Sequence, residues 1–164
     1  MQDQDMGVRG AEILRMCQYA NIATCQGNQP WNTPVTAVAD DQLSLYWSSW
    51  IRAVHSQNIA ANPAVFLTFY DSTRARGTNN RRCLYLRCEA VAVADRDEGR
   101  KAHALLYPGA DIELDDFFDD GLKRFYRARP LQAWMNVLSE KQLQPDTENM
   151  RTEVALEQIR LSTP

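Results

Sequence analysis

The 164-residue chain contains only two histidines, and its four cysteines form no Cys-x-x-Cys motif. Cys83 and Cys88 are five residues apart on one predicted strand, so their side chains point to opposite faces. Cys17 and Cys25 fall in separate predicted elements. This spacing indicates neither a disulfide framework nor a metal site. We expect reduced, buried thiols and no bound metal.

The chain also lacks an excess of positive charge and a long apolar run. Its 18 Lys and Arg residues are outnumbered by 21 Asp and Glu residues, and the arginines are scattered, so we expect no nucleic-acid partner. No apolar run approaches the roughly 20 residues that a membrane-spanning helix needs. The first five residues are acidic where a secretory signal would be basic. We therefore expect a cytoplasmic protein that does not contact membranes.

The composition is that of an ordinary globular chain. Hydrophobic residues make up 45% of the sequence, with seven glycines and seven prolines and no internal repeat. A chain of this size can bury one core, so we expect a single domain over residues 1–164.

Hydrophobic periodicity predicts more strands than helices. The predicted helices span residues 8–19, 50–61 and 95–107, and the predicted strands span 21–25, 33–39, 43–48, 64–70, 83–94, 131–138 and 153–161. Polar loops are expected at Asp71–Asn80 and Glu140–Met150. Since most connections read as hairpins, the pattern predicts a mainly β fold: an antiparallel barrel of six to seven strands with helices at its openings.

An acidic segment, Asp111–Asp120, precedes a basic one that contains Lys123, Arg124 and Arg127. Acids before a helix and bases within it are favoured by the helix dipole. We therefore interpret this charge as the solvated end of a further helix rather than as a metal or partner site.

The stretch after residue 43 carries the strongest functional signal. Alternation of Leu45 and Trp47 with polar neighbours predicts a strand, and Ser49 is a credible N-cap for the helix that follows. On that helix Arg52, His55 and Ser56 are spaced i, i+3 and i+4, beside unpaired backbone donors. This arrangement is typical of an anion pocket. The residues alone fit equally well an amphipathic helix that covers a sheet with Arg52 and His55 solvated.

The order of elements resembles the pyridoxamine 5′-phosphate oxidase-like family, the FMN-binding split barrels. The similar segments are Asn32–Thr36, Leu45–Ser49, Val54–Ile59, Asn62–Val65, Leu84–Ala90 and Phe125–Pro130 followed by Trp134. The similarity extends from about Ile13 to about Val137, and the order and spacing of these segments carry it rather than any one of them.

The resemblance implies a homodimer with two FMN molecules at its interface. It also implies the residues that bind the cofactor: Thr33, Val35 and Thr36 along the flavin ring, Trp47, Ser48 and Ser49 at the flavin or its ribityl phosphate, and His55 and Ser56 at the phosphate. Basic residues of the family are missing here, and Arg52 or a hairpin arginine (Arg74, Arg76, Arg81 or Arg82) would compensate by bidentate pairing, although an exposed loop tip is the better interpretation of the hairpin arginines. We also expect Trp47, Trp50 and Trp134 to leave aromatic area for a second subunit to cover.

The chain departs from the true oxidases in charge. It has Thr33, Val38, Val54 and His55 where those enzymes carry basic residues, so oxidation of pyridoxamine phosphate itself is not the favoured activity. The leading hypothesis is an FMN-dependent oxidoreductase that acts on an unidentified small organic substrate, with no catalytic side chain identified. The alternatives are a reductase that uses the deazaflavin F420 and a non-catalytic haem- or flavin-binding protein.

Overall fold

The computed structural model describes residues 2–73, 82–136 and 151–161. Its elements, in chain order, are α1 (Gln2–Met16), β1 (Tyr19–Gln26), β2 (Gln29–Thr36), β3 (Val38–Ala39), β4 (Leu45–Trp50), α2 (Val54–Ala61), β5 (Ala64–Tyr70), β6 (Cys83–Ala92), α3 (Arg96–Leu106), the 3₁₀ turn η1 (Leu114–Phe117), β7 (Lys123–Asn136), β8 (Arg151–Val154) and α4 (Leu156–Leu161). The fold is mainly β, as the sequence predicts.

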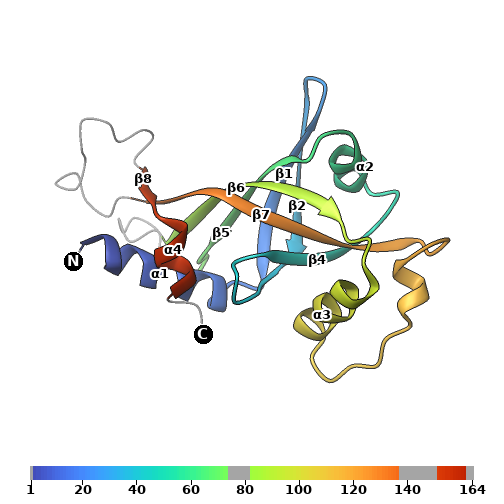
Figure 1. Cartoon of the computed structure of the whole chain (residues 1–164). Coiled ribbons are helices and arrows are strands. Elements are labelled where there is room, and N and C mark those ends of the chain that lie inside the picture. The colour runs from blue at the N-terminus through green and yellow to red at the C-terminus, as the bar shows by residue number, and fades with distance from the viewer. Residues whose placement is uncertain (1, 74–81, 137–150, 162–164) are drawn as a thin grey trace.

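The strands form one antiparallel sheet in the order β2-β1-β5-β6-β7-β4-β3, with β8 beside β7 (Figure 1). The sheet curls until β2, at one end of this order, touches β4 near the other end, but no ladder of hydrogen bonds joins the two strands in the described part of the chain. The result is a split barrel, which confirms the predicted fold class. The split lies between β2 and β4.

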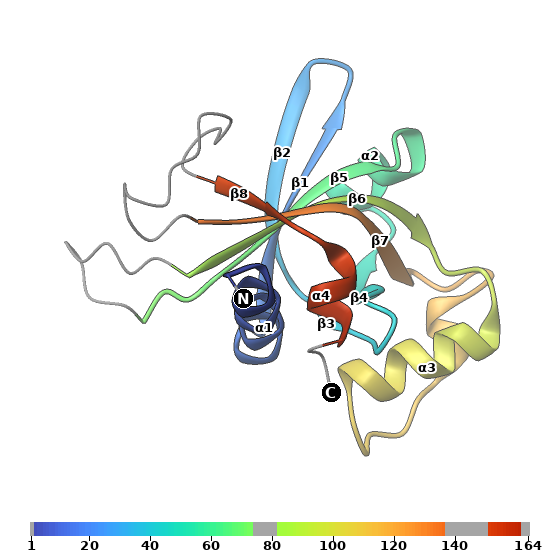
Figure 2. The same cartoon turned by 60° about the vertical axis from the view of Figure 1, so that its left-hand side comes forward.

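The barrel interior is a single apolar cluster. Alternate residues of the strands point inward and are fully buried, among them Ile22, Leu67, Leu86 and Met135. Helices α1 and α4 pack against each other beside this cluster (Figure 2). At Gly7 of α1, an added Cβ would lie 2.7 Å from Cβ of Gln158 in α4, so only glycine allows this approach.

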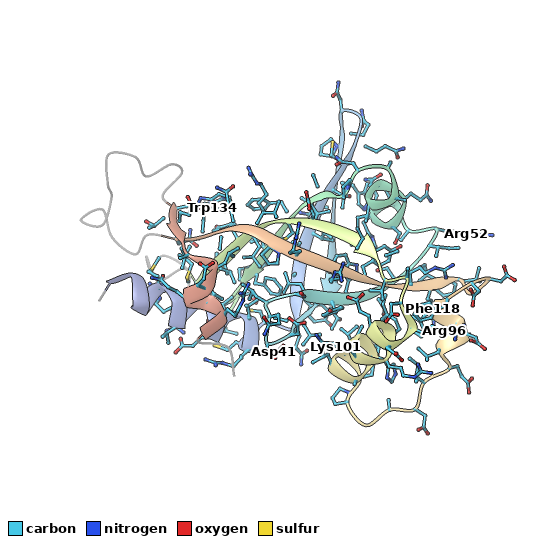
Figure 3. All side chains as sticks on the ribbon, in the orientation of Figure 1. Asp41, Arg52, Arg96, Lys101, Phe118 and Trp134 are labelled. Carbon is cyan, nitrogen blue, oxygen red and sulfur yellow. The ribbon has the colours of Figure 1, made fainter. Side chains whose placement is uncertain are left out.

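Helix α3 covers β4 with a second, smaller cluster around Phe125. Asp95 caps α3 by accepting a hydrogen bond from the backbone N–H of Glu98 at 2.8 Å, as its position in the sequence predicts. Lys101 of α3, seen in Figure 3, donates to the buried carboxylate of Asp40 at 2.6 Å. Asp40 also accepts from the backbone N–H of Ser44 at 2.7 Å, which fixes the turn that leads into β4.

Two helix boundaries differ from the prediction. Helix α1 occupies Gln2–Met16, not residues 8–19, and Tyr19 already belongs to β1. Ser49 is not an N-cap, because β4 continues to Trp50 and α2 begins only at Val54, with Ala53 in the cap position. Strand β4 extends this far because its last residues pair with the first residues of β7, Lys123 and Arg124.

The C-terminal part departs further from the prediction. Lys123, Arg124 and Arg127 lie on β7, a strand of 14 residues, and not on a helix. The acids before them have another role: Asp115 and Asp119 form ion pairs with Arg96 of α3 at 2.9 and 2.8 Å. Pro130 is tolerated inside β7 because it lies opposite the register shift between Arg87 and Cys88 of β6.

The predicted strand over residues 153–161 is wrong for most of its length. Only Arg151–Val154 is a strand, and Leu156–Leu161 forms α4, whose Ile159 is fully buried in the main core. The predicted loop Glu140–Met150 and most of the predicted hairpin tip Asp71–Asn80 lie outside the described residues.

The remaining expectations concern the cysteines, the membrane, the domain organisation and the cellular location. All four cysteines are free, and Cys88 is buried while Cys83 lies on the other face of β6. Cys17 and Cys25 are only half-buried, so the expectation of buried thiols holds fully for Cys88 alone. Among the described residues, no helix is long and apolar enough to cross a membrane. The single-domain organisation and the cytoplasmic location stay predictions.

Candidate functional site

The β4–α2 turn lies at the split in the barrel. Strand β4 pairs with β7 along its whole length, whereas β3 pairs only with Leu45 and Tyr46 of β4. Within the described residues, the outer backbone edge of Trp47–Trp50 therefore has no strand partner. Strand β2 likewise pairs only with β1 in this part of the chain. Both sides of the split thus present backbone donors and acceptors that a ligand could use.

Helix α2 closes the split at one end. It packs against β1 and β2, and Asn58 donates a hydrogen bond to Thr24 Oγ1 of β1 at 3.0 Å. Among the residues that the structure describes, no side chain caps its N-terminus, and Ala53 holds the cap position. The first backbone N–H groups of an uncapped helix carry partial positive charge and lack intrahelical partners. Helix α2 therefore presents donors next to the free edge of β4.

Ser49 and His55 join β4 to α2. Their Oγ and Nε2 atoms are 2.8 Å apart, and His55 is only 6% exposed. Burial lowers the pKa of His55 below its ordinary value of 6.5, so the imidazole is neutral at pH 7. Without a bound anion, the pair is an uncharged hydrogen-bonding unit.

Arg52 is the predicted cation of the turn. It is exposed and projects away from the barrel beside α2 (Figure 3). Its backbone carbonyl accepts a hydrogen bond from the side-chain amide of Gln57 at 2.9 Å, which holds the turn in place. A long exposed guanidinium can swing toward an anion at the helix N-terminus. Of the alternative arginines, Arg82 pairs with Glu12 at 3.6 Å, and Arg74, Arg76 and Arg81 lie outside the described residues.

Two of the predicted flavin contacts point into the core. The Trp47 ring is fully buried and stacks on Tyr126 with centroids 5.6 Å apart and planes at 12°. Val35 is also buried in the main cluster. Such side chains support the strands, and only their backbone edges are open to a ligand. Thr33 is half-buried and Thr36 exposed on the same strand as Val35.

Ser48 has a partner that the sequence does not reveal. Its Oγ is 2.7 Å from the phenol oxygen of Tyr107, the residue at the C-terminal end of α3. Tyr107 is 41% exposed, so its ring borders solvent next to the free edge of β4. The Pro108-Gly109 pair marks the end of α3 in the sequence. The sequence near Tyr107 carries no pattern that predicts contact with a serine 59 positions earlier.

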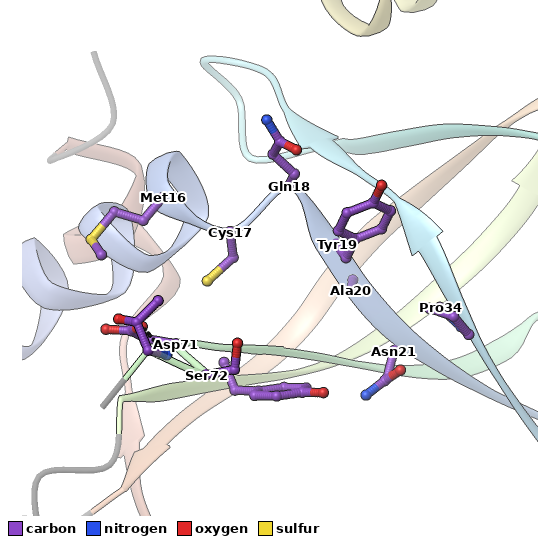
Figure 4. A pocket seen from close by; sticks show the side chains of 11 residues that line it. Met16, Cys17, Gln18, Tyr19, Ala20, Asn21, Pro34, Asp71 and Ser72 are labelled. Atoms are coloured by element: carbon purple, nitrogen blue, oxygen red, sulfur yellow. Dashed lines mark hydrogen bonds between the residues drawn. The ribbon is translucent and has the colours of Figure 1, made fainter. Parts of the chain in front are cut away.

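A separate hollow of about 480 Å³ lies where α1 ends and β1 begins (Figure 4). Cys17 lines it, and burial, followed by Asp71 and Cys83, raises the pKa of this thiol. A protonated thiol beside the carboxylate of Asp71 disfavours an anion. This hollow is therefore a poor candidate for a phosphate group, in contrast to the β4–α2 turn.

Comparison with known proteins identifies the family. Residues 9–134 match the pyridoxamine 5′-phosphate oxidase family over most of the chain. The chain belongs to this family. No curated protein matches it.

Solved structures with the same fold differ in their described ligands. One is a Listeria innocua protein named for the same oxidase family, at 16% identity and a TM-score of 0.62, covering 82% of this chain and 98% of that one. Another is a heme binding protein from Mycobacterium smegmatis, at 14% identity and a TM-score of 0.69, covering 94% and 60%. A third is a FAD-binding protein from Mesorhizobium loti, at 16% identity and a TM-score of 0.57, covering 74% and 87%. These identities establish the fold alone.

Proposed function

We propose that this protein is an FMN-binding flavoprotein that transfers electrons between the flavin and a small organic molecule. The observation that carries the proposal is the Ser49–His55 pair beside the uncapped N-terminus of α2, at the split of a barrel from the pyridoxamine 5′-phosphate oxidase family. The flavin-binding neighbour from Mesorhizobium loti supports the same class of cofactor.

The residues of the turn fit a phosphate ester. The backbone N–H groups of the first turn of α2 and the Ser49 hydroxyl can donate to its oxygens. Arg52 supplies the positive charge, and a phosphate close to the buried His55 raises the pKa of its imidazole and favours the protonated form. FMN, when bound, supplies the redox chemistry, and the chain supplies binding and orientation.

The edges of the split fit a flat ring. The free backbone edges of β4 and β2 can hydrogen-bond to the polar rim of a flavin, with Thr33 and Thr36 on one side and Ser48 on the other. Tyr107, held by Ser48, adds an aromatic face at the same edge. Flavin sites combine apolar surface with a few convergent polar groups, and the backbone edges, Ser48 and the threonines would supply the polar part here.

The substrate is proposed to differ from pyridoxamine phosphate. Thr33, Val38 and Val54 are uncharged where the true oxidases carry basic residues, and His55 is taken up by the cofactor phosphate in this proposal. A substrate with its own phosphate would find little positive charge here. A small organic molecule without a phosphate group is the better match.

The partner is proposed to be a second copy of the chain. Phe66, Tyr85 and Trp134 form an aromatic cluster on the outer face of the sheet. The ring centroid of Phe66 lies 6.4 Å from that of Tyr85 and 6.1 Å from that of Trp134. Trp50 is 56% exposed at the end of β4. Trp47, by contrast, is covered by its own chain, so the expectation that it leaves area for a partner is wrong.

Haem is the second candidate cofactor, favoured by the Mycobacterium smegmatis neighbour. Neither histidine is presented as an axial ligand, however. His55 is buried with Nε2 against Ser49, and His103 is buried against Tyr107 and Phe125. We therefore rank haem below FMN, and F420 remains an alternative within the same site.

The proposal is tested by titrating the purified full-length chain with FMN, FAD, F420 and haem, followed by absorbance and fluorescence. We expect saturation by FMN at one molecule per chain, and light scattering at micromolar concentration should give a dimer. Saturation by F420 or haem with no response to FMN contradicts the cofactor. A monomer contradicts the shared site.

A further inference from the structure

A second hollow, of about 330 Å³, lies between α2, β6 and β7. Ser56 and Tyr126 form part of its lining, and Ala60, Pro63 and Val91 are exposed around it. Its volume falls at the lower end of the range for small-molecule sites, which is about 300–1,000 Å³. A hollow of this size holds a single-ring compound.

The hollow contains a buried hydroxyl, that of Ser56, which lacks a well-formed hydrogen bond within the described part of the chain. Ser56 is 3% exposed, and its Oγ faces Tyr126 without forming a hydrogen bond of ordinary geometry. A buried polar atom without a partner costs free energy, and a ligand that supplies the partner recovers it. The hollow therefore has one specific polar contact to offer.

Among the described residues, no charged side chain lines the hollow. All other lining residues are apolar: Ile59, Ala60, Pro63, Ala90, Val91 and Ala92. Burial raises the pKa of Tyr126, while the nearby Ser56 hydroxyl and Arg124 act in the opposite direction, so the phenol stays protonated at neutral pH. An ammonium group placed in the hollow would lose its hydration without compensation, and a carboxylate would have only Arg124, which does not line the hollow, to offset that loss.

We propose that this hollow is a binding site for an uncharged single-ring organic molecule whose amide or hydroxyl group hydrogen-bonds to Ser56. The ring packs among the apolar residues of α2 and β6. The site does not depend on the flavin proposal: Ser56, which the family resemblance implies at the phosphate, lines this hollow, and the phosphate contacts proposed above do not include it. Tyr126 connects the two regions, because it lines the hollow and also stacks on Trp47 of β4.

The test uses three probes with the same ring and different charge: benzamide, benzoate and benzylamine. Each is titrated into the purified full-length chain, and binding is followed by amide chemical shifts in two-dimensional NMR. We expect benzamide to shift the amides of Ser56 and Ala90–Ala92, and to bind at least tenfold more tightly than either charged probe.

Two variants locate the site, and a third serves as the control. Ala60→Phe places a ring in the hollow from an exposed helix position and should abolish benzamide binding, whereas Ala61→Phe, one position further on the same exposed helix end, should leave it unchanged. Ser56→Ala removes one hydrogen bond and should weaken benzamide about tenfold. Ala60→Phe should leave FMN affinity as it is, which separates this site from the cofactor site.

Three outcomes overturn the proposal. One is equal binding of the charged and uncharged probes. Another is benzamide binding that survives Ala60→Phe or is lost equally in Ala61→Phe. The third is no shift of these amides by benzamide up to its solubility limit, as expected if a second copy of the chain fills the hollow. If the protein fails to bind FMN, these three outcomes keep their meaning, because none of them depends on the flavin.

Discussion

Helices α1 and α2 both cover the curled sheet, but they bury different kinds of residue. Helix α1 buries small and apolar ones: Gly7, Gly10, Ala11, Ile13 and Leu14. Helix α2 is half as long, and three of the four residues that it buries are polar: His55, Ser56 and Asn58. Apolar burial stabilises a fold directly, whereas buried polar groups cost free energy unless they find partners, as His55 does at Ser49 and Asn58 does at Thr24. The contrast places α1 in the core and is consistent with the proposal that α2 takes part in binding.

The largest expected effect is on the α1 side. Gly7→Val forces a branched side chain against α4, since even a Cβ would lie 2.7 Å from Gln158 Cβ and 2.8 Å from its backbone carbonyl group. Overpacking of this kind costs about 1–3 kcal/mol of unfolding free energy. Urea unfolding measures it. FMN affinity of the folded variant should be unchanged, and a loss of affinity as large as that in a β4–α2 variant would undo the contrast.

A smaller effect is expected from pH on the α2 side. Because burial lowers the pKa of His55, the unfolded chain takes up a proton at a higher pH than the folded one. The stability contributed by neutral His55 is fully present above pH 6.5 and is lost as the pH falls toward the lowered pKa. His55→Ala should therefore lose less stability than the wild type between pH 7.5 and pH 5.

Asn58→Ala is the control for this pH effect, because Asn58 is also buried on α2 but does not titrate. Its unfolding free energy should fall by the same amount at both pH values relative to the wild type. If His55→Ala and Asn58→Ala show the same pH dependence, His55 is not the titrating group.

The smallest expected effect concerns Tyr107. Tyr107→Phe removes the 2.7 Å hydrogen bond with Ser48. Because this hydrogen bond is exposed to solvent, the unfolding free energy should fall by only about 0.5 kcal/mol. If the phenol helps to set the edge of the flavin slot, FMN affinity falls about two- to threefold, a change that fluorescence titration resolves. Tyr70→Phe, at another exposed tyrosine remote from the turn, is the matched control. Equal effects in both variants would remove Tyr107 from the site.

Much of the sheet could be predicted from local pattern. Strands β5 and β6 alternate inward and outward residues cleanly, and Asn62-Pro63 ends α2 where the sequence indicates. Prediction fails where tertiary contacts decide. Ser49 resembles an N-cap, but pairing with β7 keeps its segment extended. The bases of Lys123–Arg127 resemble a helix terminus, but the acids before them are bound by Arg96 of α3.

The candidate site was predictable only in part. The spacing of Arg52, His55 and Ser56 indicates a polar turn, and the structure brings His55 to Ser49 within 2.8 Å. The sequence does not show that His55 is buried and neutral, nor that Ser56 lines an apolar hollow. Both depend on tertiary packing, and the hollow at Ser56 involves Tyr126 of β7, about 70 positions away in the chain. The flavin contacts themselves stay a prediction.

The most direct test of the central claim is a titration of FMN into the wild type, His55→Ala and His103→Ala, followed by quenching of flavin fluorescence. The two histidines are similarly buried, at 6% and 8% exposure, but only His55 lies at the β4–α2 turn. We predict that FMN saturates the wild type at one molecule per chain, that His55→Ala weakens it about tenfold, and that His103→Ala changes it little. Equal affinity in all three proteins would contradict the placement of the phosphate at this turn.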